Sequence, residues 1–450
     1  MTASAMIVDH RNVGAAFRRL SLPTAVAMLG DQILSIVDTI VIGSLGPVAL
    51  AGATGAVTVF TAIVFGAIGF MNGCGIIAAQ RVGAHDLDGF GKTVRAGLVV
   101  PVGVALVAAM VTVAVAHPLI HAMVGKLASA DASASYLSVR MFSLIPIAIS
   151  GTLITGLGAA GNRKLGVIIL AIINVVHIPL LLVLALGWVT HHPYGIVGAG
   201  ISSLLSEAIA AVYGVIYVAR RPVYRVFTQL AVDLRLAMQC ARLGSPEAVF
   251  LLAVMTPDAF IVAMLAPLGA LTISGFRALN VASDLTFVVP SPLQSAVQTV
   301  IGQRLGAGDV EGARSFFRRA RVVASWISAA AGIGAALLAW PAAYAFTLNA
   351  TVASVAAWPL AAHMATLPIK GWSMVSMAPI RASGDTRFSM TIGIVTSLLV
   401  FPASYICIRV LHIGLWGVPV AWMFAWSARA AITAFKLRDE SWTRRRLITA

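Results

Sequence analysis

Charged side chains are scarce in this 450-residue chain, where they make up 10% of the residues against 59% for hydrophobic ones. A soluble globular domain carries about 25% charged residues, because its surface must be hydrated. The composition therefore excludes a soluble globule and predicts an integral membrane protein.

Cysteine is also scarce. The three cysteines, Cys74, Cys240 and Cys407, are scattered and odd in number, so they predict neither a disulfide framework nor a metal site. A Walker A loop, the H-E-x-x-H motif and the G-x-S-x-G motif are all missing. We therefore expect a protein that is not an enzyme and that holds no metal and no cofactor.

Apolar runs of about 20 residues, the length that crosses about 30 Å of hydrocarbon, recur along the whole chain. The alternation of a membrane β-barrel is absent. We predict an all-α integral membrane protein with twelve transmembrane helices. Their expected spans are residues 21–43, 51–74, 95–117, 136–158, 166–188, 196–218, 245–266, 271–298, 320–346, 354–378, 388–409 and 413–435.

The chain repeats itself at an offset of about 223 residues, which is the separation of Pro23 and Pro246. The heptapeptide 80–86 returns as 303–309 at the same offset. Each repeat holds six predicted spans, an even number, so both halves enter the membrane from the same side. We therefore predict two six-helix bundles related by a pseudo-two-fold axis along the membrane normal.

The repeated heptapeptides contain helix-end signals. We expect Gly83 and Gly306 to end their helices in the left-handed conformation that glycine adopts without strain. Asp86 and Asp309 are expected to cap the helices that follow.

Lys and Arg outnumber Asp and Glu by 31 to 16. Most of them lie near the N-terminus, in the connections after even-numbered spans and in the C-terminal tail. This positive-inside pattern predicts two cytoplasmic termini in a cell inner (plasma) membrane and explains the basic charge without nucleic acid. We expect the basic residues to contact anionic lipid headgroups.

The connection between the halves has an amphipathic pattern, since Val226, Leu230, Leu234 and Met238 recur at helical spacing. It predicts a helix along the cytoplasmic membrane surface, or a simple structured tether. The expected parts are an N-terminal six-helix lobe (1–218), a cytoplasmic amphipathic linker (219–244), a C-terminal six-helix lobe (245–435) and a basic cytoplasmic tail (436–450).

Ionisable residues inside the spans are candidates for function, because each costs at least about 2.5 kcal/mol at the bilayer centre unless it faces protein or water. Asp31 and Asp38, seven residues apart, share one face of the first span. Asn174 and His177 share a face of the fifth span, and Ser203 lies in the sixth. These five residues form the candidate cation-coupling site, although any one of them could be a purely structural partner.

The second half carries Asp258, Arg277, Asp284 and Lys370 inside its spans. We expect them to line a substrate cavity. Lys370 should face that cavity or pair with Asp258 or Asp284. An unpaired ammonium in the cavity would favour neutral or anionic substrates, because it repels cations across a low-dielectric space.

Several motifs together resemble the multidrug and toxic compound extrusion (MATE) transporters. They include Val37-Asp38-Thr39, the segment 302–309, and the sequence from Arg381 to Thr386 after the tenth span. The resemblance covers essentially the whole chain. It implies two six-helix bundles, a central cavity and the export of small organic compounds, drugs or a natural product, in exchange for protons or sodium.

Residue by residue, the chain is most similar to the branch that includes the DNA-damage-inducible transporters. In that branch the first-span aspartate is the coupling carboxylate, and Asp38 holds its place. Asn174 matches an asparagine of the fifth span, but the aspartate that follows it in the family is replaced, and His177 is the titratable neighbour. Ser203 keeps the hydroxyl of a family threonine.

Two positions depart from the sodium-coupled branch. Its glutamate on the seventh span would align with Val254, and its aspartate on the tenth with Lys370. Asp258, one helical turn beyond Val254, could substitute for the glutamate. Lys370 reverses a charge.

These residues favour protons over sodium, since a carboxylate beside an imidazole exchanges protons near neutral pH. In the alternative, Asp38 and Asp31 build a sodium site with Asn174 and Ser203, and His177 only packs. Two other functions stay open: a flippase for a lipid-linked precursor, and a membrane scaffold without transport. We expect a monomer.

Overall fold

The fold is known from a computed structural model, in which every regular element is a helix within the residues described. The all-α prediction is therefore confirmed. The residues that the structure describes are 6–8, 12–125, 129–189, 191, 193–229 and 231–448.

The chain divides into two compact units. Unit 1 contains Met1–Ile7 and Leu22–Ala248, and unit 2 contains Val8–Ser21 and Val249–Ala450. The division thus falls after residue 248, whereas the sequence placed it in the linker 219–244. The start of the first helix also belongs to unit 2 rather than to the first half of the chain.

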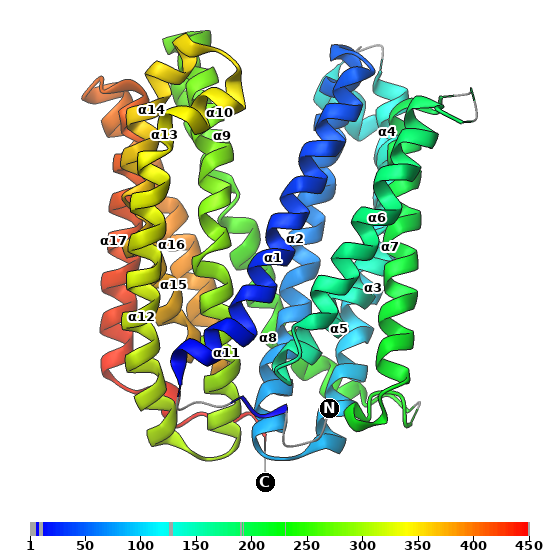
Figure 1. Cartoon of the computed structure of the whole chain (residues 1–450), viewed down its shortest axis with the longest axis vertical. Helices are drawn as coiled ribbons and strands as arrows, with labels where there is room; N and C mark the ends of the chain where they lie inside the picture. The colour runs from blue at the N-terminus through cyan, green and yellow to red at the C-terminus, as the bar shows by residue number, and fades with distance from the viewer. Residues whose placement is uncertain are drawn as a thin grey trace. The chain divides into compact units, whose positions relative to one another are not determined.

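Unit 1 is a bundle of long helices (Figure 1). They are α1 (Val13–Ser44, whose first residues belong to unit 2), α2 (Pro47–Gly83), α3 (Leu87–Val124), α4 (Ala130–Phe142), α5 (Leu144–Ala159), α6 (Lys164–Leu186), α7 (Gly195–Ala219), the 3-10 turn η2 (Pro222–Tyr224) and most of α8 (Leu234–Ala253). Along their lengths α6 packs on α7, α2 on α3, and α5 on α2 and α3.

Unit 2 repeats the bundle with more interruptions. Its elements are α9 (Thr256–Leu265), η3 (Ala266–Leu268), α10 (Ala270–Leu285), η4 (Thr286–Val288), α11 (Pro290–Gly306), α12 (Val310–Leu337), α13 (Ala339–Thr347), α14 (Ala350–Met364), α15 (Leu367–Ala382), α16 (Thr386–Tyr405), the π-helical η5 (Ile406–Val410), η6 (Gly414–Trp416), α17 (Gly417–Arg438) and η7 (Ser441–Thr443). Here α15 packs on α11 and α12, and α16 on α17.

Small residues allow the helix backbones to approach closely, as in many membrane bundles. In unit 1 a Cβ at Gly198 of α7 would lie 2.5 Å from the carbonyl oxygen of Leu184 on α6. In unit 2 a Cβ at Gly332 of α12 would lie 2.9 Å from the carbonyl oxygen of Met364 on α14. A side chain at either position would force the two helices apart.

Ten helices within the described residues are long and apolar enough to cross a membrane, and an eleventh span results if α14 and α15, which meet at a bend of 40°, count as one. The remaining predicted span, 271–298, is divided between α10 and α11, of 16 and 17 residues. Pro290 and Pro292 explain the interruption, since proline lacks the N–H that an uninterrupted helix needs.

The predicted linker helix is wrong in its first half, because α8 begins only at Leu234. The side chain of Asp233 caps this start, accepting hydrogen bonds from the N–H groups of the two residues after Leu234 at 2.9 and 3.1 Å. Leu230, which the prediction included, lies outside the described residues. The amphipathic segment is therefore the beginning of a long helix and not a separate element.

Both units use the same capped turn, 223 residues apart. Asp86 precedes α3 and accepts a hydrogen bond from the N–H of Gly89 at 2.7 Å, and Asp309 precedes α12 and accepts one from Gly312 at 2.8 Å. In each unit an arginine of the preceding helix forms an ion pair with this aspartate. The predicted aspartate caps are confirmed.

The left-handed residue of this turn is not the predicted one. Gly83 and Gly306 are the last residues of their helices, and the positive φ belongs to His85 (59°) and Gly308 (77°). In both turns the chain reverses directly before the capping aspartate. The residue that precedes the aspartate, His85 or Gly308, therefore adopts the left-handed conformation. Unit 1 thus has a histidine where unit 2 has a glycine that adopts the same conformation without strain.

We predict that His85→Gly stabilises the protein by about 1 kcal/mol, because glycine relieves the left-handed strain. His85→Ala is the matched control, since it removes the imidazole but keeps the Cβ. Thermal unfolding of the purified protein in detergent measures the effect. Equal stability of the glycine and alanine variants would show that the backbone at residue 85 is not strained.

Candidate functional site

The central feature of unit 1 is a hydrogen bond between Asp38 of α1 and His177 of α6. The Nε2 atom of His177 lies 2.6 Å from Oδ1 of Asp38. The imidazole is 1% exposed, whereas the carboxylate is 30% exposed. The predicted proximity of the two residues is confirmed. The pair therefore joins a buried base to a carboxylate that other groups can reach.

The pattern of α1 separates its two carboxylates from its large apolar side chains. Its large apolar side chains recur at alternating spacings of four and three and are between 47% and 65% exposed. Asp31 and Asp38, seven residues apart, lie on the opposite side of the helix. The apolar stripe consists of Leu22, Val26, Leu29, Ile33, Ile36 and Ile40.

The second ring nitrogen of His177 is buried and has no hydrogen-bond partner in the described part of the chain. When the ring is neutral and donates from Nε2 to Asp38, this Nδ1 atom is an acceptor. When the ring is protonated, both nitrogens donate. The Nδ1 side of the buried ring is therefore left without a partner among the described residues.

The other expected members of the site do not contact Asp38 through hydrogen bonds that the structure shows. The amide of Asn174 donates to the carbonyl of Leu170 at 3.0 Å, and the hydroxyl of Ser203 donates to the carbonyl of Ala199 at 3.1 Å. Both acceptors lie on the residue's own helix. Asn174 does lie at the close contact of α6 with α1, because a Cβ at Gly30 would be 4.0 Å from its amide nitrogen.

A partly buried ion pair that sequence reasoning had not assigned to the site completes it. Nη1 of Arg140 on α4 lies 2.8 Å from Oε1 of Glu207 on α7. The guanidinium also lies over the ring of Phe60, 4.2 Å from its centroid. Arg140 is an exception to the positive-inside pattern. This exception is the sequence signal that could have identified it as a member of the site.

These groups form one electrostatic cluster. Arg140 interacts with Asp38 and Asp31, and Glu207 interacts with His177. With Asp31, Asp38 and Glu207 ionised and Arg140 charged, the formal charge of the cluster is −2 when His177 is neutral and −1 when it is protonated. An excess of negative charge within an apolar bundle attracts a cation.

Unit 2 has a buried cation instead. Lys370 of α15 is 2% exposed. Its Nζ donates to the hydroxyl of Thr286 at 2.6 Å and lies 3.1 Å from the centroid of the Phe287 ring. Among the described residues no carboxylate lies within ion-pair distance of it, so the predicted pairing with Asp258 or Asp284 is wrong. The break at η4 places a hydroxyl and an aromatic face there instead.

A histidine that the sequence did not single out lies close to this cation. His363 of α14 is 3% exposed, and its Nε2 lies 2.8 Å from the hydroxyl of Ser283. The carbonyl of Ser283 in turn accepts a hydrogen bond from Thr286 at 2.5 Å. Ser283 therefore contacts His363 through its hydroxyl and Thr286, the partner of Lys370, through its carbonyl.

The remaining predicted cavity residues lie near Lys370 without direct contact. Asp258 and Asp284 interact with it electrostatically, and Arg277 does so with Asp284. Asp258 stands in the first turn of α9, and the chain is not helical between α8 and α9. The expectation that Asp258 continues the face of Val254 by one helical turn is therefore wrong.

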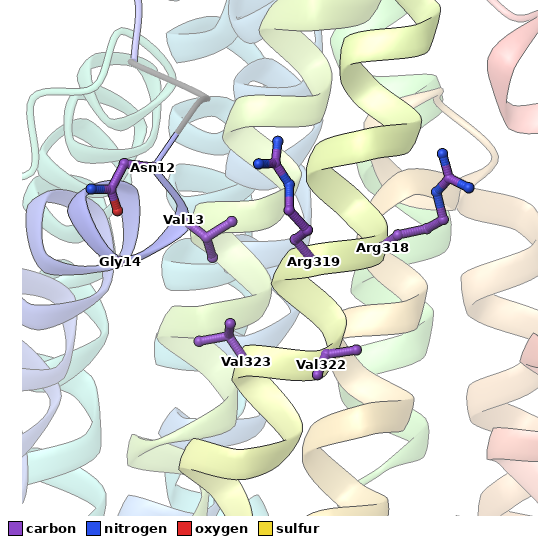
Figure 2. Close-up of a pocket in the computed structure, with 7 residues that line it drawn as sticks. All are labelled: Asn12, Val13, Gly14, Arg318, Arg319, Val322 and Val323. Carbon is purple, nitrogen blue, oxygen red and sulfur yellow. The ribbon is translucent and has the colours of Figure 1, made fainter.

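A separate open pocket of about 640 Å³ lies in unit 2, between the start of α1 and one face of α12 (Figure 2). Figure 2 shows two arginines at one level of α12 and two valines one turn further along. One part of the pocket is thus basic and the adjoining part is apolar. Its lining residues are Asn12, Val13, Gly14, Arg318, Arg319, Val322 and Val323.

The MatE family model matches the chain twice, over residues 23–183 and 246–406. The chain belongs to the MatE family. The two matches begin 223 residues apart, which confirms the internal duplication. The resemblance of the motifs to MATE transporters is confirmed as well.

Curated bacterial relatives are similar along much of their length. The probable multidrug resistance protein NorM of Aromatoleum aromaticum is 26% identical over 63% of this chain and 62% of its own length. NorM of Halalkalibacterium halodurans is 25% identical over 76% and 75%, and the multidrug resistance protein MdtK of Edwardsiella ictaluri is 27% identical over 75% and 75%. The chain thus spans less than two thirds of the first relative and about three quarters of the other two.

Solved structures share the fold of this chain. A MATE protein in its straight conformation has a TM-score of 0.89 at 19% identity, covering 98% of this chain and 99% of its own. A MOP superfamily transporter from Pyrococcus furiosus, described as having a binding pocket of reversed polarity, has a TM-score of 0.88 at 19% identity, covering 99% of each chain. The predicted fold of two six-helix bundles is confirmed.

We predict that Lys370→Met stabilises unit 2 by about 1 kcal/mol or more, because it removes a buried charge that lacks a carboxylate partner. Thr286→Val should destabilise it by about 1–3 kcal/mol, since the ammonium loses its oxygen acceptor. Thermal unfolding in detergent measures both variants.

Thr396→Val is the control, because that buried hydroxyl bonds only within its own helix, to Ile392 at 2.6 Å. The penalty of Thr286→Val should largely disappear when it is combined with Lys370→Met. A penalty that persists unchanged in the double variant would contradict the assigned role of Thr286.

Proposed function

We propose that this transporter exports small organic compounds in exchange for protons, and that Asp38 and His177 form its coupling site. The observation that carries the proposal is the 2.6 Å hydrogen bond between a reachable carboxylate and a buried imidazole. Membership of the MatE family supports export over the flippase and the scaffold. The names of the relatives, multidrug resistance proteins, support small organic substrates.

The contacts of Asp38 favour a proton over sodium. Sodium is a hard cation that prefers several oxygen ligands, as calcium and magnesium do. The partner of Asp38 here is a nitrogen, while the side chains of Asn174 and Ser203 donate to carbonyls of their own helices. The residues of the proposed sodium alternative are thus present but not assembled around the carboxylate.

The energy of one proton is sufficient for useful export. A membrane potential contributes about 2.3 kcal/mol per charge per 100 mV, and each pH unit contributes about 1.4 kcal/mol. With 100 mV and one pH unit, one proton supplies about 3.7 kcal/mol, which opposes a gradient of a neutral substrate of between two and three decades.

The charge of the substrate stays open. The expectation of neutral or anionic substrates required an exposed ammonium at Lys370, and this residue is 2% exposed and bonded to Thr286. Lys370 is therefore assigned to the packing of unit 2. Asp258, Arg277 and Asp284 stay candidates for substrate contact, and Asp31 stays a candidate for the coupling site.

The transporter is assigned to the bacterial inner membrane as a multi-pass protein with both termini in the cytoplasm, from its charge distribution and its relatives. It acts as a monomer, because one chain supplies both repeats. The pocket in Figure 2 fits a lipid: Arg318 and Arg319 could bind a phosphate, and Val322 and Val323 could contact the acyl chains.

We predict that Asp38→Asn abolishes proton-driven export, because the amide cannot take up a proton. Uptake of ethidium into everted vesicles under an imposed pH gradient, without sodium, measures the loss. Asp88→Asn is the matched control, since Asp88 is an exposed carboxylate paired with Arg225 outside the candidate site. Undiminished export by Asp38→Asn would refute the coupling role.

A second variant separates the two ions. His177→Gln should retain binding of the substrate but move the pH dependence of export, because the base that shares the proton is gone. If a sodium gradient alone drives export at clamped pH, or if His177→Gln leaves the pH profile unchanged, the coupling ion is not the proton that this pair would carry.

A further inference from the structure

A cluster of metal-binding side chains lies at the end of α3 and the start of α4, apart from both sites described above. His117 and His121 are four residues apart, so they share a face of α3. Asp131 stands in the first turn of α4. One nitrogen of each imidazole and one carboxylate oxygen lie within 4.8 Å of one another.

We propose that these three residues bind one zinc ion, which joins the end of α3 to the start of α4. Two imidazoles and a carboxylate on a solvent-exposed surface leave a fourth position for water. This donor set suits zinc and related divalent transition metals better than the hard cations magnesium and calcium, which prefer oxygen ligands. The zinc site is additional to the proposed function, because the proposed export does not require it.

The distances fit a tetrahedral ion. Oδ1 of Asp131 lies 2.9 Å from Nε2 of His121 and 3.5 Å from Nδ1 of His117. Ligand atoms at about 2.0–2.2 Å from a tetrahedral zinc lie about 3.3 Å apart. Since all three side chains are exposed, small rotations would bring the set to this geometry without disturbing the packed bundle.

The position gives the ion a structural role. Both histidines belong to the last turns of α3 and lie on either side of Pro118, which lacks an N–H. Gly125 then ends the helix with a positive φ of 65°. A bound ion would hold the two helix ends together across the connection between them, and would stabilise the folded state by mass action.

The test uses purified, tag-free protein that has been treated with a chelator. This protein is titrated with zinc, and isothermal titration calorimetry measures the binding. We expect one ion per chain and a zinc-dependent rise in the melting temperature. The variants His117→Gln and His121→Gln should each bind at least about tenfold more weakly. His191→Gln is the control, because His191 is exposed in the same unit but outside the cluster.

Asp131→Asn adds an independent check, since it keeps the shape of the side chain while removing its charge. Cobalt should give the absorption bands of a tetrahedral site in the wild type and in the His191 control only. Zinc binding that persists when His117 and His121 are both replaced by Gln would overturn the proposal. Zinc that binds only between two molecules, seen as a zinc-dependent dimer in size-exclusion chromatography, would overturn it as well.

Discussion

A charged side chain inside an apolar helix bundle must find a hydrogen-bond partner, because an unsatisfied charge there costs several kilocalories per mole. The two units meet this requirement in different ways. In unit 1 the carboxylate of Asp38 is bonded to a titratable base, His177. In unit 2 the ammonium of Lys370 is bonded to the hydroxyl of Thr286 and lies on an aromatic ring. The first partner is a nitrogen base, whereas the second is a hydroxyl and an aromatic face.

The difference between the units arises in the backbone. The helix α2 runs without interruption through 37 residues, whereas its counterpart is divided into α10, η4 and α11. At the repeat offset, Pro290 and Pro292 correspond to Ala67 and Gly69, which do not interrupt a helix. The two prolines of unit 2 thus accompany the helix break at η4, and this break places Thr286 in contact with Lys370. The duplicated halves kept their capped turns while their buried polar groups diverged.

Much of this could be predicted from the sequence, for a physical reason in each case. The spans follow from hydropathy, and the duplication follows from motifs that recur at one offset. The pairing of Asp38 with His177 was anticipated, since both residues are costly in a membrane and need partners. Arg140 shows the limit of this reasoning. Its place in α4 departs from the positive-inside pattern, but which acid it meets depends on how α4 packs against α7, and spacing along the chain does not encode this.

Local conformation was the less predictable level. Glycine at residue 83 indicated a left-handed helix end, yet the turn places that conformation two residues later, on His85. Likewise the amphipathic pattern around Met238 predicted a separate surface helix, whereas the cap at Asp233 begins a helix that continues to Ala253. In both cases a side-chain cap decides the position of the helix end, and several positions in the sequence could supply that cap.

The central claim is that the pair of Asp38 and His177 exchanges a proton when substrate binds. Calorimetry of ethidium binding to the purified transporter, in buffers that differ in ionisation enthalpy, counts that proton directly. The account predicts the release of about one proton per bound dye by the wild type and none by Asp38→Asn, by reciprocal linkage between the two ligands. An equal proton count in both proteins, or a count of zero in the wild type, would contradict it.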